Sequence, residues 1–189
     1  MSMRIMFLSL AASLAVSTPA FAQGRSPWAP YGVRDALDDR LTVVEQQVVP
    51  AADAMPDSLF TYAPTGGAFA GVRSFGEQLK HLAAANWQLG AKALGEQPPA
   101  GTHDEMAPAS IQTPAQIRAY LRGSFQCLHR AIARTDARNL MDPLDGLSGT
   151  WQRTRFGLVI DAIAHSSAQC PRLPDRQARD PRRHPYRVR

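Results

Sequence analysis

Residues 74–95, SFGEQLKHLAAANWQLGAKALG, indicate the fold class of this 189-residue chain. Ser74 followed three residues later by Glu77 is typical of a helix start, because each side chain can bond the backbone N–H of the other residue. Apolar residues then recur at helical spacing, namely Phe75, Leu79, Leu82 and Leu89. Gly95 is typical of a helix end. The stretch therefore predicts an amphipathic helix that runs to about Leu94.

Three further segments show the same spacing and complete a set of four predicted helices. Residues 31–54 and 113–134 carry apolar side chains at helical steps, and Pro114 after Thr113 favours a helix start there. A shorter stripe begins near Arg155 and consists of Phe156, Val159, Ile160 and Ile163. Pro171 ends that last helix, and the later prolines prevent its resumption. No segment alternates with period two, so the sequence predicts an all-α four-helix bundle with a truncated last helix.

The first 22 residues have the pattern of a signal peptide. Arg4 precedes a short apolar run over residues 5–16, and Ala20 and Ala22 offer the small side chains that signal peptidase recognises. We therefore expect the bundle domain to cover residues 23–170 and to be periplasmic or secreted, with no transmembrane segment after signal cleavage. An oxidising compartment would allow a bond between Cys127 and Cys170, but the sequence leaves open whether they pair.

The formal net charge of +5 is concentrated at the C-terminus. Residues 172–189 carry seven arginines against Asp175 and Asp180, whereas the chain between Arg4 and this tail has a net charge of −1. A nucleic-acid-binding domain needs basic groups on its folded surface, so the charge distribution argues against nucleic acid as a partner of the bundle. A small-molecule substrate is the expected partner. The sequence leaves open whether the protein forms a homodimer.

The residues with catalytic or metal-binding potential are histidines. The sequence contains no GxSxG motif, no phosphate-binding glycine loop and no dinucleotide fingerprint. His81 lies at the edge of the apolar stripe of its helix, and His165 lies two residues after Ile163. Imidazoles that face inward from different helices are how bundles build metal sites. From spacing alone, hydrogen-bonded structural histidines remain the alternative.

Three stretches together resemble the DinB-like (damage-inducible B) superfamily of four-helix-bundle metalloproteins. They are residues 51–64, residues 73–83 with the sequence RSFGEQLKHLA, and residues 154–167. In that family a divalent metal is held by one histidine of the second helix and two of the last helix, spaced H-x3-H. The resemblance implies His81 and His165 as ligands, and it places Gln169 at the third position. Gln is a weak oxygen ligand, so the implied metal, whether Zn, Ni or Fe, would have an incomplete histidine set.

The family resemblance stops where the composition changes. After Ser167 the chain turns rich in Arg and Pro, which we interpret as a frameshift in the gene or its record, and residues 171–189 are then an aberrant or disordered tail. A genuine basic tail that binds acidic lipid or nucleic acid is the alternative.

Two functions follow for the bundle itself. Known DinB-like members are thiol-dependent transferases and isomerases, so the resemblance implies an exported metal-binding protein, of transferase or hydrolase type with an unidentified substrate. The alternative is a non-catalytic helical-bundle binding protein of the cell envelope, in which the histidines are structural.

Overall fold

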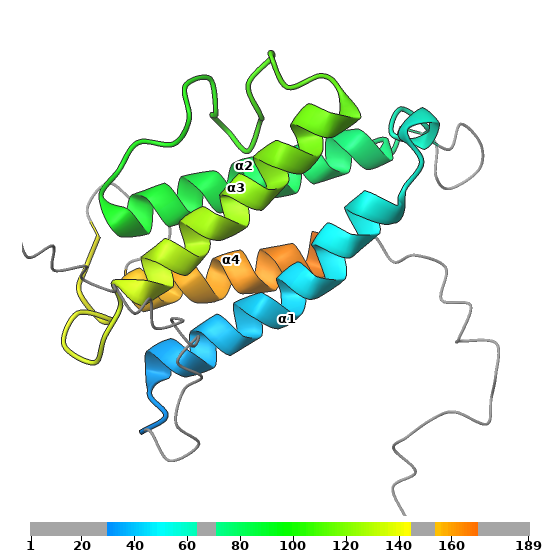
Figure 1. The fold of residues 1–189 in the computed structure, drawn as a ribbon. Coiled ribbons are helices and arrows are strands. Elements are labelled where there is room, and N and C mark those ends of the chain that lie inside the picture. Colours follow the sequence, from blue (N-terminus) through cyan, green and yellow to red (C-terminus); the bar gives the residue numbers. More distant parts are fainter. Residues whose placement is uncertain (1–29, 64–70, 145–153, 170–189) are drawn as a thin grey trace, which may run out of the picture. The chain divides into compact units, whose positions relative to one another are not determined.

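A computed structural model describes residues 30–63, 71–144 and 154–169, and within these ranges the chain is helical and has no strand. The helices are α1 (Val33–Ala54), α2 (Phe75–Leu94), α3 (Pro114–Ala133) and α4 (Arg155–Gln169), with a 3-10 turn, η1, at Asp57–Leu59 (Figure 1). The described residues from Tyr31 onward belong to one compact unit. The predicted signal peptide, Cys170 and residues 171–189 lie outside the described residues.

The four helices form a closed ring, which confirms the predicted four-helix bundle. α1 packs on α3, α3 on α2, α2 on α4, and α4 returns to α1, with the most extensive contact between α2 and α3 (Figure 1). Two glycines allow that close contact. A Cβ on Gly90 of α2 would lie 2.8 Å from Cys127 Sγ, and one on Gly123 of α3 would lie 2.9 Å from the Trp87 ring. Both distances are too short for a side chain, so the α2–α3 spacing depends on glycine at these positions.

The predicted helix ends are confirmed for α2 and α3. Ser74 and Glu77 form the reciprocal capping box of α2, and Gly95 ends the helix in the left-handed conformation with φ 71°. Thr113 caps α3 in the same way through Gln116, with Pro114 in the first turn. These side chains satisfy backbone N–H groups that have no partner within the helix.

A side chain from α3 bonds carbonyl groups at the C-terminal end of α1. Arg118 donates to the carbonyl oxygens of Ala52 at 2.9 Å and Met55 at 2.8 Å, and it pairs with Asp57 at 2.7 Å. Its guanidinium also lies 4.6 Å from the Phe60 ring centroid, so α1, η1 and α3 are joined at one end of the bundle.

α4 is the shortest helix, at 15 residues against 20 to 22 for the others. Its predicted stripe was wrong at one position. Ile160 is 43% exposed, and Leu158 and Ala162 are buried in its place. None of the helices in the described ranges has the length and apolar character that a membrane crossing needs.

Candidate metal centre

His81 and His165 lie next to each other, as the family resemblance implied. His81 is in the second turn of α2 and His165 is near the end of α4, and the two helices pack side by side. Their ring centroids are 5.3 Å apart with planes inclined at 59°. A neighbouring hydrogen bond from Ser166 Oγ to Asn86 Oδ1, 2.9 Å long and buried, joins the same two helices. The bundle thus holds two imidazoles at a distance at which both can reach one ion.

Glu105, in the loop between α2 and α3, joins the two histidines. Its Oε2 lies 3.3 Å from His81 Nε2. One ligand atom from each of His81, Glu105 and His165 lies within 4.8 Å of the other two, a spacing found for no other such cluster of His, Cys, Asp or Glu in the described ranges. Two imidazoles and one carboxylate form a ligand set of catalytic zinc and non-haem iron sites.

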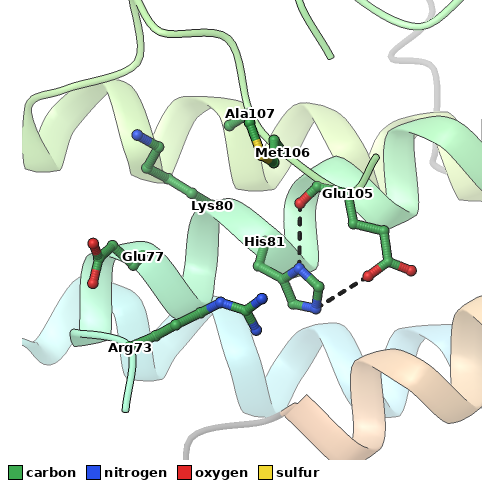
Figure 2. A pocket seen from close by; sticks show the side chains of 7 residues that line it. All are labelled: Arg73, Glu77, Lys80, His81, Glu105, Met106 and Ala107. Carbon is green, nitrogen blue, oxygen red and sulfur yellow. Dashed lines mark hydrogen bonds and ion pairs between the residues drawn. The ribbon is translucent and has the colours of Figure 1, made fainter. Parts of the chain in front are cut away.

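The loop presents Glu105 in a conformation that local sequence does not favour. Asp104 and Glu105 have φ values of 45° and 57°. Non-glycine residues rarely adopt this left-handed region, and it persists where surrounding contacts hold it. Two such contacts come from one face of α2. Gln88 Oε1 accepts from the Glu105 N–H at 2.9 Å, and His81 Nδ1 lies 3.2 Å from the Glu105 carbonyl oxygen (Figure 2).

The contact with the Glu105 carbonyl oxygen determines which ring nitrogen of His81 donates a hydrogen bond. A carbonyl oxygen can only accept, so Nδ1 of His81 carries a proton and, in the neutral ring, Nε2 presents its lone pair. That lone pair lies opposite the Glu105 carboxylate at 3.3 Å. Two acceptors at this distance require a shared cation, which is either a proton on Nε2 or a metal ion between them.

His165 is the member of the ligand group whose ring nitrogen has no hydrogen-bond partner. Its Nε2 is buried and has no hydrogen-bond partner. Burial lowers the pKa of His165, and the attraction of the Glu105 carboxylate does not cancel that effect. The ring is therefore neutral at neutral pH, which is the form that ligates metals. A buried polar atom without a partner lowers the stability of the fold. A divalent ion held by His81, Glu105 and His165 would give this nitrogen a partner, so the three side chains fit such an ion.

Gln169, the third ligand predicted from the resemblance, lies one turn after His165. Its Oε1 accepts a hydrogen bond from Gln78 of α2. The oxygen that would ligate is thus in contact with an amide, and the role of Gln169 as a ligand stays a prediction.

The other described histidines are not part of this group. His129 Nδ1 lies 2.6 Å from Asp38 and its Nε2 lies 2.9 Å from Glu45, so each ring nitrogen has its own carboxylate on α1. His103 is 62% exposed and pairs weakly with Asp104 at 3.7 Å. Glu77 belongs to the capping box of α2, as the sequence predicted.

Sequence reasoning did not find Glu105. The only local sign is an acidic pair after His103 in a loop rich in Pro and Gly, and such pairs are common on solvated loops. The contact that selects Glu105 runs from Gln88, which is 17 residues earlier in the chain.

The comparison with protein families identifies the family of this bundle. The model of the DinB superfamily matches residues 40–166, which include most of α1, all of α2 and α3, and α4 up to the residue after His165. The chain belongs to the DinB superfamily. The match contains all three members of the His81–Glu105–His165 group. A search of the curated proteins found no match.

Proposed function

We propose that this DinB-superfamily protein binds one divalent transition-metal ion through His81, His165 and Glu105, with Glu105 in the role that a third histidine has in the pattern of the family. The buried Nε2 of His165, which has no hydrogen-bond partner and lies beside the imidazole of His81 and the carboxylate of Glu105, carries the proposal. Gln169 at the expected third position is a poor ligand and contacts Gln78 instead. The loop carboxylate supplies the missing charge and donor.

The open side of the ligand group indicates a reactive rather than a purely structural ion. Three protein ligands leave coordination positions free, and the Glu105 side chain is 50% exposed. A bound ion would act as a Lewis acid on a water, thiol or carbonyl group of a substrate. His81 and Gln88 hold the Glu105 backbone in place, which keeps the carboxylate directed at the histidines. A transferase or hydrolase type of reaction is consistent with such a site.

Metal analysis tests this proposal. We expect purified protein loaded with zinc and then dialysed to retain about one equivalent, measured by inductively coupled plasma mass spectrometry, because three ligands converge on one point. The double variant His81→Ala/His165→Ala should retain none, and Glu105→Gln should retain less. His103→Ala is the matched control, because it removes an exposed histidine two residues from Glu105 and should not change the metal content.

A non-catalytic bundle is the competing function, and one observation favours it. His81 already contacts Glu105 through both ring nitrogens, so a protonated His81 would be satisfied without metal. That function predicts equal metal content in the wild type and the double variant, which is the result that overturns metal binding.

We propose in addition that the protein is exported and that the mature chain begins at Gln23. The support is the pattern of residues 1–22. N-terminal sequencing of protein recovered from the periplasm or medium should start at Gln23. Recovery of the intact N-terminus from the cytoplasm would contradict export.

A further inference from the structure

The ligand group borders a cavity whose wall also carries charged side chains that are not ligands. The cavity has a volume of about 270 Å³ and includes His81 and Glu105 in its wall. Figure 2 shows Arg73, Glu77 and Lys80 along one side and Met106 and Ala107 on the loop. A concave site of this size, next to ligand side chains, fits part of a small molecule.

Two cations, Arg73 and Lys80, line this cavity, and Arg73 lies on the side of His81. Its side chain extends toward His81 in Figure 2 and lines the same cavity. Within the described ranges neither Arg73 nor Lys80 makes a hydrogen bond or ion pair. A guanidinium presents several donors in a plane that matches a carboxylate or phosphate.

The two acidic residues in the cavity wall have other partners. Glu77 Oε2 accepts from the Ser74 N–H at 2.7 Å as part of the helix cap. That hydrogen bond is the main reason why the pKa of Glu77 is lowered. Glu105 lies against His81. The charges of Lys80 and Arg73 also act on Glu77, but no hydrogen bond joins either of them to it in the described part of the chain, so the donors of Arg73 are available to a ligand.

A second cavity adjoins the first and is more apolar. It has a volume of about 320 Å³ and shares Glu77 and Lys80 with the first cavity. Its wall includes Phe60, Pro114 and Ile117. Lys80 thus lies where the two cavities meet, and one molecule could place an anionic end in the first and an apolar part in the second.

We propose that the site takes a small anionic molecule with an apolar body, whose carboxylate or phosphate group binds Arg73, assisted by Lys80, beside the ligand group. This anion subsite extends the proposed metal site. It depends on the metal only for a reaction after binding, and anion binding itself does not need the metal. The anion subsite itself is formed by residues outside the ligand set. Arg73 is therefore a substrate-binding residue that sets specificity for charge.

The experiment measures charge preference with paired probes. Phenylacetate and phenyl phosphate supply the two anionic groups, and phenylacetamide is the neutral counterpart. Dissociation constants are measured by NMR titration on the full mature chain, both metal-free and zinc-loaded, because bound zinc also attracts anions. The variants are Arg73→Gln, which removes the charge, and Arg73→Lys, which keeps it. Arg40→Gln, an exposed arginine on α1, is the matched control.

We expect at least one anion to bind about tenfold more tightly than phenylacetamide in metal-free wild type, from a charged hydrogen bond. The preference should disappear in Arg73→Gln and persist in Arg73→Lys and Arg40→Gln. Arg73 is exposed and precedes α2, so thermal unfolding of all variants should match the wild type. Equal binding of anions and amide, no binding of any probe, or a preference that survives Arg73→Gln would overturn the anion subsite. Failure of the metal proposal would instead show as no zinc retained, whatever the probes do.

Discussion

His129 and His165 are both partly buried between helices, yet their surroundings are opposite. His129 lies between two carboxylates, Asp38 and Glu45, with both ring nitrogens bonded. His165 has a buried Nε2 with no hydrogen-bond partner, and the His81 imidazole and the Glu105 carboxylate lie within 4.8 Å of it. Burial lowers the pKa of both rings. At His129 the hydrogen bonds to Asp38 and Glu45 outweigh burial and raise the pKa, whereas at His165 burial prevails.

The difference separates a histidine whose ring nitrogens both have partners from one whose buried Nε2 has none. A charged ring bonded to two carboxylates is complete and needs no ligand. A neutral ring with a buried, unpartnered nitrogen lowers the stability of the fold until a ligand binds that nitrogen. Proximity to acidic groups is therefore a poor guide to a metal site, because the histidine with more carboxylates is the one without an available lone pair.

Replacing each histidine by leucine should give the largest difference between the two sites in the free energy of unfolding. In metal-free protein, His129→Leu should lower the free energy of unfolding by about 2 kcal/mol, because it leaves two partly buried carboxylates without their cation. His165→Leu should change it by less than about 1 kcal/mol, and toward higher stability, because it removes a buried polar atom that has no partner. Urea unfolding at pH 6 followed by circular dichroism measures both.

Metal content is the control for this pair, because His129→Leu should bind zinc like the wild type and His165→Leu should not. If His165→Leu is as destabilising as His129→Leu, the His165 ring has a structural role and the contrast fails.

The sequence predicted what local chemistry determines. The caps at Ser74 and Thr113 and the end at Gly95 follow from hydrogen bonds and backbone preferences within a few residues, and the structure has all three. The pairing of His81 with His165 came from the family resemblance, since spacing alone did not distinguish a ligand from a structural histidine.

The parts that sequence did not predict depend on contacts between distant segments. Ile160 fits an apolar stripe, but a helix of 15 residues offers few turns to define its buried face, and packing selects Leu158 and Ala162. Glu105 enters the ligand group because Gln88 and His81 of α2 hold the loop backbone. No pattern within residues 97–110 encodes that contact.

The pH dependence of the free energy of unfolding tests whether His129, unlike His165, stabilises the fold through its charge. Its pKa in the folded protein lies above the usual 6.5 of the unfolded chain. A raised pKa means that the folded state binds the proton more tightly, so the stabilisation is fully present below pH 6.5 and is lost as pH rises through the folded pKa. We expect the stability advantage of wild type over His129→Leu to be largest near pH 6 and to shrink toward pH 9.

Urea unfolding of both proteins across this pH range, without metal, isolates the effect, because every other titrating group is common to the pair. His129→Gln should behave like His129→Leu, since an amide also lacks the titrating charge. A constant difference from pH 6 to pH 9 would mean that His129 acts by packing alone. The ring between Asp38 and Glu45 would then be neutral, and the electrostatic contrast with His165 would lose its basis.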